Sequence, residues 1–202
     1  AINSLKAYEG VVKIKKVSTT NVTVVDLPST VASLVNEVCN KFTGTIENTY
    51  TFTSGKTVDG VAITDVVEPL GRNATLTENG VYGSHAKINA EANIPRSLRI
   101  QLVSETERFD GTSTVNAVHN ASVIKTINFA TLDLLGDMKI TSADTTYPGT
   151  QIYAQFDDLG RITSLSLERP FESRTKAKAA SVSMTLNFKV DMSEEYTITY
   201  VS

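Results

Sequence analysis

The sequence predicts a sheet-dominated α+β fold: a strongly twisted antiparallel sheet, half-barrel or sandwich-like, with one main helix packed on its apolar face. Polar and apolar side chains alternate almost without a break from Thr150 onward, most clearly between Ser181 and Val190. A period of two places the two classes on opposite faces of a strand. A composition rich in Thr and Val also favours sheet. No linker or composition shift divides the chain, so we expect a single domain over residues 1–202.

The N-terminal section reads as two strands followed by a helix. Val11–Val17 and Val22–Val25 predict a hairpin whose turn is Ser18–Asn21. A helix is expected over residues 29–42, because apolar residues recur there at the spacing of one helical face. Its stripe consists of Val31, Leu34, Val35, Val38 and Phe42, and Cys39 lies on the same side as a small hydrophobic residue that we expect to be buried.

Further strands follow the helix. We expect strands at 45–52 and 61–67 around a Ser54-Gly55 turn, and a hairpin of 80–94 with 98–104. Residues 110–136 have no clear pattern and are left without a predicted state. The last part of the chain predicts five strands, at Met138–Ser142, Thr150–Phe156, Ile162–Glu168, Lys178–Val190 and Tyr196–Val201, with turns at Tyr147–Gly149 and Asp157–Gly160 and a link at Met192–Glu195.

Composition and charge exclude several classes of protein. A net charge of -3 gives no electrostatic reason to expect nucleic acid, and the absence of Trp weakens an aromatic stacking platform. No apolar run approaches the ~18 residues of a transmembrane segment. The chain begins at Ala1 without an initiator Met, as a mature chain does after its leader is removed and as a trimmed chain also does. We expect an extracellular or cell-envelope location.

The residue types that carry catalysis are scarce. His85 and His119 lack the spacing of a zinc motif, and the single Cys39 cannot build a metal site or an intrachain disulfide. We therefore expect no enzyme activity, no metal and no cofactor. Adjacent acids at Asp157-Asp158 and Glu194-Glu195 fall in predicted turns, where most such residues are solvated. Two alternatives stay open: a weak calcium site at such a tip, and a polysaccharide hydrolase with two carboxylates facing each other across a groove.

Two surfaces are candidates for binding. The first is a basic cluster in the predicted connection between the strands Ile162–Glu168 and Lys178–Val190. It would contact an anionic surface or a cell-envelope polymer; the alternative is that these side chains are only solvated. The cluster consists of Arg169, Arg174, Lys176 and Lys178. The apolar face of the C-terminal strands carries more apolar surface than one helix can cover, which suits an acyl chain or another amphiphile. The candidate ligand-binding residues are Ile152, Phe156, Leu165, Leu167, Met184, Leu186 and Phe188. The alternative is a core filled by the protein's own side chains.

The C-terminal quarter resembles the secreted bacterial lipoprotein carriers of the LolA-like and LppX-like half-barrel type. The resemblance rests on Asp158, Gly160, Ile162 and Leu165 in a hairpin followed by long Ser/Thr-alternating strands. It implies a strongly curved antiparallel sheet plugged by helices, and the binding of an amphiphile without enzyme activity. Those carriers usually show more helices than the one predicted here, and this chain has no N-terminal Cys for lipidation.

Two hypotheses follow. The first is a non-enzymatic extracytoplasmic protein that holds a hydrophobic or amphipathic ligand, such as a lipid, against the concave face of a curved sheet. The alternative is a structural cell-surface protein, an adhesin or filament subunit, whose β core is fully self-packed and whose Ala1–Gly10 segment serves as a free arm for self-association.

Overall fold

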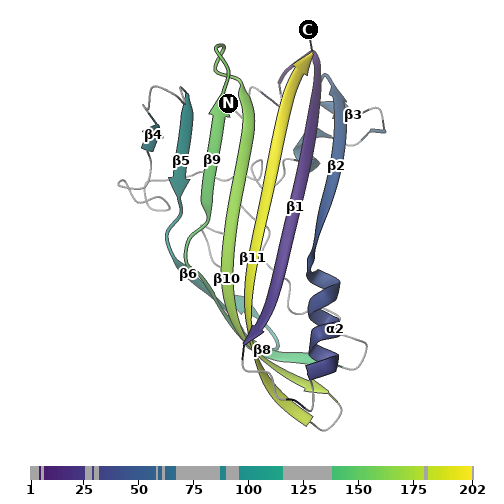
Figure 1. The fold of residues 1–202 in the computed structure, drawn as a ribbon, viewed down its shortest axis with the longest axis vertical. Coiled ribbons are helices and arrows are strands. Elements are labelled where there is room, and N and C mark those ends of the chain that lie inside the picture. The colour runs from purple at the N-terminus through teal and green to yellow at the C-terminus, as the bar shows by residue number, and fades with distance from the viewer. Residues whose placement is uncertain are drawn as a thin grey trace.

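The chain folds around a single antiparallel sheet in the computed structural model (Figure 1). The structure describes residues 5, 7–25, 29, 32–57, 59–60, 62–66, 87–89, 96–115, 138–179 and 182–201. The strands are β1 (Val11–Val25), β2 (Gly44–Thr53), β3 (Lys56–Thr57), β4 (Lys87–Asn89), β5 (Ser97–Gln101), β6 (Glu105–Phe109), β7 (Thr114–Val115), β8 (Met138–Tyr147), β9 (Gln151–Phe156), β10 (Ile162–Ala179) and β11 (Val182–Val201), and the helices are α2 (Ala32–Phe42) and α3 (Ile63–Val66).

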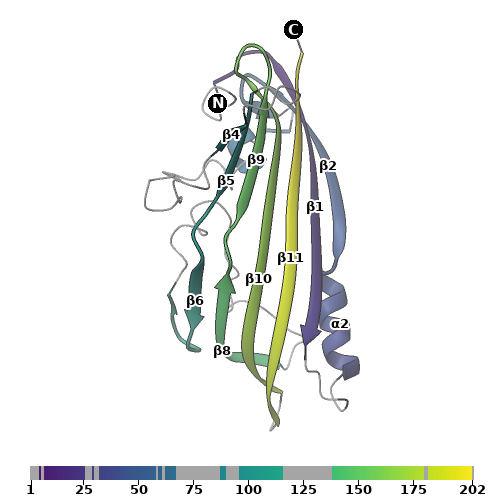
Figure 2. The same ribbon diagram turned by 60° about the vertical axis from the view of Figure 1, so that its left-hand side comes forward.

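The strand order follows β3-β2-β1-β11-β10-β8-β6-β7, with β9 beside the upper half of β10 and then β5 and β4. Figures 1 and 2 show long, twisted strands whose lower ends curl toward α2, while the two chain ends lie at the upper end. The predicted sheet-dominated fold with one main helix is therefore confirmed. The described strands form one sheet, so the half-barrel description fits them and the two-sheet sandwich does not.

Three predicted breaks in strands are wrong. The expected N-terminal hairpin is one strand, β1, which runs through Ser18–Asn21. The expected connection at 169–177 lies inside β10, and the link at Met192–Glu195 lies inside β11. These segments are neighbours in the sheet, since Ser18 pairs with Glu194 and Met192 pairs with Arg169. Polar side chains interrupt the apolar alternation at the same level of the sheet on all three strands. In the sequence such an interruption has the same appearance as a turn between two strands.

Other boundaries also differ from the prediction. The segment expected as a strand at 61–67 contains α3, whose Ile63 and Val66 are both buried three residues apart, as a helical face requires. The helix predicted over 29–42 is α2, and Cys39 is buried as expected. Phe42, expected on the buried stripe, is instead 43% exposed. In the expected free arm, Leu5 is buried in the core.

Two neighbouring strands of the sheet are interrupted at the same height. Pro148–Thr150 separates β8 from β9, and Leu102–Ser104 separates β5 from β6. The pairing register is the same on both sides, because Gln101 pairs with Gln151 and Glu105 with Tyr147, four residues further along each strand. A hydrogen bond from Leu102 N to Thr150 O, 2.8 Å long, spans the interruption. Tyr147–Gly149, predicted as a turn, is thus the end of β8 and a shared irregularity.

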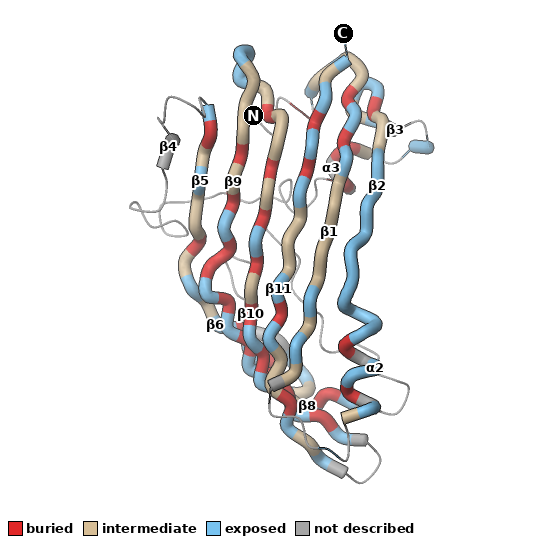
Figure 3. The backbone as a smooth tube through the Cα atoms, viewed as in Figure 1, coloured by how far each residue is buried: buried red, intermediate tan, exposed pale blue. Residues whose placement is uncertain are grey.

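We call inner face the side of the sheet that carries the even-numbered residues of β11, from Met184 to Tyr200. Its upper half holds the main hydrophobic core, built on β1, β9, β10 and β11 and closed by α3 and Leu5. Its lower half contacts α2 through a smaller cluster that contains Val35, Cys39 and Leu186. The core is therefore divided along the strands rather than spread evenly over the face (Figure 3).

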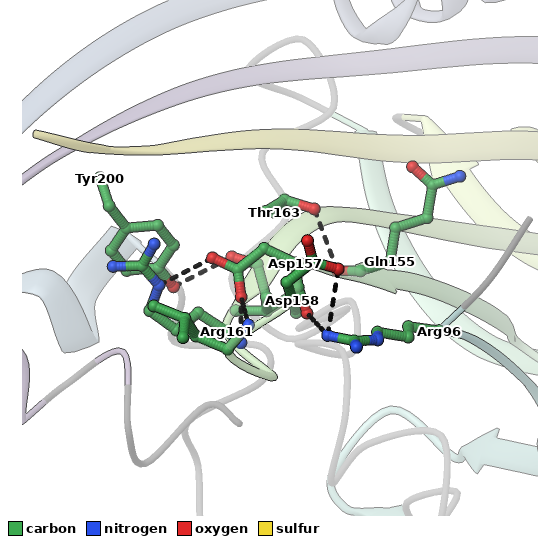
Figure 4. A network of polar contacts seen from close by, with 9 residues as sticks. Arg96, Gln155, Asp157, Asp158, Arg161, Thr163 and Tyr200 are labelled. Carbon is green, nitrogen blue, oxygen red and sulfur yellow. Dashed lines mark hydrogen bonds and ion pairs between the residues drawn. The ribbon is translucent and has the colours of Figure 1, made fainter.

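The tip of the β9–β10 hairpin is held by a network of polar contacts (Figure 4). Asp157 accepts hydrogen bonds from the backbone N–H of Leu159 and Arg161 and from Arg161 Nε, at 3.0, 2.8 and 2.7 Å. Burial opposes the shift, but the hydrogen bonds from Arg161 and Leu159 outweigh it and lower the pKa of Asp157. Asp158, which carries the resemblance, has a fully exposed side chain and contacts Arg96 at 3.3 Å. The organising carboxylate is therefore Asp157.

Candidate functional site on the inner face

A belt of polar side chains crosses the inner face at mid-height. On β1 and β11, Lys16 Nζ lies 3.0 Å from Glu194 Oε1, and the Tyr196 hydroxyl donates a hydrogen bond of 2.8 Å to Glu194 Oε2. The same ammonium group lies 5.2 Å from the centroid of the Tyr196 ring. Lys16 and Glu194 keep partial contact with water, with side chains 18% and 23% exposed. This half of the belt is thus an ion pair at the rim of the main core.

The other half of the belt is fully buried. Glu107, on β6, has no exposed surface, and Oε2 accepts a hydrogen bond of 2.9 Å from the Tyr147 hydroxyl. Arg169, on β10, is 4% exposed, and Nη2 lies 3.2 Å from Met192 Sδ. We define the polar belt by these two halves together: Lys16, Glu107, Tyr147, Arg169, Glu194 and Tyr196.

Burial dominates the electrostatics of the belt. It raises the pKa of Glu107, against the opposing effects of the Tyr147 hydrogen bond and the Arg169 charge. It lowers the pKa of Arg169, while the charges of Tyr147, Glu194 and Glu107 act in the opposite direction. It also raises the pKa of Tyr147, and the Glu107 carboxylate adds to that shift. Oε1 of Glu107 has no hydrogen-bond partner among the described residues. The belt places opposite charges beside each other where water is scarce.

Sequence reasoning missed most of the belt. Of its members only Arg169 was a predicted site residue, and it was expected on the surface. The sequence did contain one signal, the alternation of faces along a strand. Glu107 lies two residues before Phe109 in β6 and therefore shares its buried face. An acid at an inward position of a strand indicates a buried polar contact.

Below the belt, part of the inner face is incompletely covered. Five apolar residues of β1 and β11 that face inward there are only partly buried, although Leu186 and Val190 beside them are buried; above the belt, Val12, Ile14 and Ile198 are almost completely buried. We call these five the lower patch: Val22, Val24, Met184, Phe188 and Met192. Beside them on β8 and β10 lies a row of buried hydroxyls, in which Ser173 Oγ lies 2.9 Å from Thr145 Oγ1 and 3.1 Å from Thr175 Oγ1. Partly exposed apolar side chains therefore adjoin a row of hydroxyls that are buried and hydrogen-bonded to each other.

The predicted ligand-binding residues fall into two groups. Ile152, Leu165 and Leu167 are buried in the main core, and Phe156 packs against the same cluster. Met184 and Phe188 belong to the lower patch, and Leu186 beside them is buried under α2. The structure thus brings together three of the seven below the belt and places the other four in a core filled by the protein's own side chains.

The predicted basic cluster is divided between the two faces of β10. Arg169 faces inward, whereas Arg174, Lys176 and Lys178 are exposed on the outer face. The cause is the period of two, since an odd-numbered residue of this strand segment points inward and an even-numbered one outward. The three outer residues therefore stay a candidate contact for an anionic surface, and Arg169 does not.

Other candidate chemistry finds little support in the part of the chain that the structure describes. No three His, Cys, Asp or Glu side chains gather there as a metal site would require. Neither described helix has the length and apolar character needed to cross a lipid bilayer. His85 and His119 lie outside the described residues.

Known proteins add no relationship to this picture. No family model, no curated protein and no solved structure matches the chain.

Proposed function

We propose that this protein is a non-enzymatic binder of a hydrophobic or amphipathic ligand, which lies on the lower patch of the inner face. One observation carries the proposal: Val22, Val24, Met184, Phe188 and Met192 face the same side as the main core yet stay partly exposed. Removal of apolar surface from water lowers the free energy by roughly 25 cal/mol for each Å². An apolar ligand that covers these side chains therefore gains binding free energy.

The surroundings of the lower patch suit a ligand with one polar end. The hydroxyl row of Thr145, Ser173 and Thr175 lies to one side. The polar belt lies above, with the guanidinium of Arg169 next to Met192. Binding sites of this kind are mostly apolar with a few placed polar groups that fix the orientation of the ligand. We therefore expect a single-chain amphiphile, such as a fatty acid, to bind more tightly than a hydrocarbon of the same length.

The arrangement of carboxylates supports a binding role over glycoside hydrolysis. Glu107 and Glu194 are the two belt acids, and they lie on β6 and β11, which β8 and β10 separate. A glycoside hydrolase needs both carboxyl groups free to act on the sugar from opposite sides. Each belt acid is instead engaged, Glu107 by Tyr147 and Glu194 by Lys16.

Titration with a fluorescent fatty acid tests the proposal, together with native mass spectrometry of protein purified from its source. We expect saturable binding by the wild type and a loss of about tenfold or more in affinity for Phe188→Asp. Leu159→Asp is the matched control, because Leu159 is an apolar residue that is 76% exposed at a hairpin tip far from the patch. Equal binding by both variants, or no binding by the wild type, would refute the proposal.

The extracellular or cell-envelope location belongs to the same proposal and is supported by the resemblance to secreted carriers. The alternative, a structural surface protein with a self-packed core, is favoured by one observation, the large cluster of the protein's own buried side chains on the upper half of the inner face. Light scattering separates the two functions, because a filament subunit grows to large assemblies with concentration whereas a ligand carrier does not.

A further inference from the structure

Along most of its length the outer edge of β2 has no neighbour among the strands that the structure describes. From Gly44 to Thr51 this strand pairs with β1 on one side, and β3 joins its other side only at Phe52 and Thr53. No other described strand pairs with that outer side. The residues from Gly44 to Thr49 are all exposed, and Figure 3 shows β2 as an almost continuous exposed stretch.

This edge lacks the protection that the opposite edge has. On the opposite side of the sheet, β5 and β6 are short, separated by an irregularity and partly covered by β4 and β7, and they carry Arg99, Glu105 and Arg108. Short edge strands, irregularities and charges are the devices by which proteins prevent pairing with another chain. β2 is ten residues long, contains no Pro and carries a single charged residue, Glu47, which Lys15 balances at 3.0 Å.

Exposed apolar side chains gather where this edge begins. Ile46 is 64% exposed on β2, and Phe42 is 43% exposed at the end of α2, four residues earlier in the chain. Near the other end of the open edge lies Tyr50, which is half-buried and whose ring stacks on that of the buried Phe52 with centroids 6.2 Å apart. An antiparallel second copy of β2 would bring the apolar start of one strand to the aromatic end of the other.

We propose that β2 pairs with β2 of a second copy of this chain, antiparallel about a two-fold axis, with Asn48 opposite Asn48 of the partner copy. Directly opposed residues share a face of the sheet, and neighbouring residues of a strand lie on opposite faces. The axis must therefore lie midway between the two copies of one residue. An axis at Glu47 would oppose two carboxylates, which is destabilising. An axis at Thr49 shortens the overlap because β3 occupies the edge beyond Thr51, and an axis at Ile46 shortens it because β2 begins at Gly44.

With Asn48 opposite Asn48, the other opposed pairs of side chains are also compatible. Thr45–Thr51 of each copy overlap, and Ile46 lies opposite Tyr50, a pair of apolar and aromatic side chains of the kind that stabilises neighbouring strands. Each Glu47 lies opposite Thr49 and keeps its own Lys15, so the joined edge carries no net charge. A two-fold contact of this kind closes on itself, and the assembly stops at two copies. The inner faces of both copies then belong to one continuous sheet.

Sedimentation and light scattering test whether the edge pairs. We expect a dimer whose dissociation constant rises by about tenfold or more in Ile46→Lys, because Lys blunts a sheet edge. Thr146→Lys is the control, since Thr146 is exposed on the central strand β8 opposite Glu172 and should leave the dimer intact. A wild type that stays monomeric up to about 1 mM overturns the proposal, as does an Ile46→Lys variant that dimerises normally.

Cysteine crosslinking tests the register. Asn48→Cys should form a disulfide between copies under mild oxidation, because opposed Cα atoms in a ladder lie within disulfide range. Thr45→Cys and Thr51→Cys should crosslink when the two variants are mixed and far less when each is alone. Crosslinking of Thr45→Cys alone in preference to Asn48→Cys overturns the register. Fatty-acid binding by Ile46→Lys should equal that of the wild type, so this proposal and the ligand-binding proposal fail independently.

Discussion

Removal of one hydroxyl from the polar belt gives a sharp test of how the inner face is stabilised. Tyr147 is 1% exposed, and its hydroxyl donates the 2.9 Å hydrogen bond to Glu107, which has no exposed surface. Tyr147→Phe keeps the ring and its contact with Phe171, whose centroid lies 5.6 Å away. The substitution therefore removes the hydrogen bond with little change in packing.

The expected cost depends on the charge of Glu107. A hydrogen bond to an ionised group contributes about 1.5–3 kcal/mol, and one between neutral groups about 1 kcal/mol. We expect Tyr147→Phe to lower the free energy of unfolding by about 2 kcal/mol when Glu107 is ionised and by about 1 kcal/mol when it is protonated. For a protein of this size, 2 kcal/mol corresponds to a fall of roughly 4–8 °C in Tm.

The pH dependence has a definite sign. Burial raises the pKa of Glu107 in the folded protein, so the wild type loses stability as pH rises from the ordinary Glu pKa through the raised one. The Tyr147 hydrogen bond limits that shift. Without it the folded pKa rises further, and the variant loses more stability over the same rise in pH. The penalty of Tyr147→Phe should therefore grow with pH.

Urea unfolding between about pH 4 and pH 8 measures this penalty. Tyr196→Phe is the matched control, because its hydroxyl binds Glu194, which keeps Lys16 and is 23% exposed in its side chain. We expect a cost of about 1.5 kcal/mol for the control, the low end of the range for a hydrogen bond to a charged group, because Glu194 keeps contact with Lys16 and with water. A Tyr147→Phe penalty that is constant with pH, or no larger than the control, would refute the description of Glu107 as a buried, partly stabilised acid.

Three further predictions concern glycine, cysteine and the helix contact. Gly149→Ala should destabilise the fold by about 1–3 kcal/mol more than Gly160→Ala. Both glycines have positive φ, but only at Gly149 would an added Cβ meet a backbone atom, Leu102 O, at 2.4 Å. Thermal unfolding of the two variants measures the difference. Cys39 should react with a thiol reagent at least about tenfold more slowly in the native protein than in urea, since burial raises the pKa of its thiol; equal rates would show that α2 is undocked. Leu186→Ala should cost about 2–5 kcal/mol in urea unfolding and expose Cys39 to the same reagent, because Leu186 is 1% exposed beneath α2.

Much of the fold can be predicted from the sequence because one face of the sheet is buried. Alternation in β11 from Ser183 to Val190 correctly indicates which residues point inward, and helical spacing correctly locates α2. The prediction fails where inward residues are polar. Ser18, Arg169 and Glu194 occupy inward positions on three adjacent strands, and each was assigned to a turn or a connection.

The candidate site is harder to predict because pairing across the sheet determines it. Glu107 and Tyr147 are far apart in the sequence, and only the β6–β8 register brings their side chains together. No local pattern distinguishes partly exposed Phe188 from buried Leu186, since both are apolar and alternate correctly. The difference lies in what packs above each one, which depends on where α2 docks.

The position of β11 has a consequence for how the chain reaches its native state. This strand, formed by the last described residues, lies in the middle of the sheet between β1 and β10 and joins the two halves. During synthesis the β1–β2 ribbon therefore keeps its apolar inner face uncovered until residues 182–201 have left the ribosome. Assembly should be slow and all-or-none, limited by closure of the long loop that joins β1 to β11, and truncation within β11 should abolish both halves together rather than one of them.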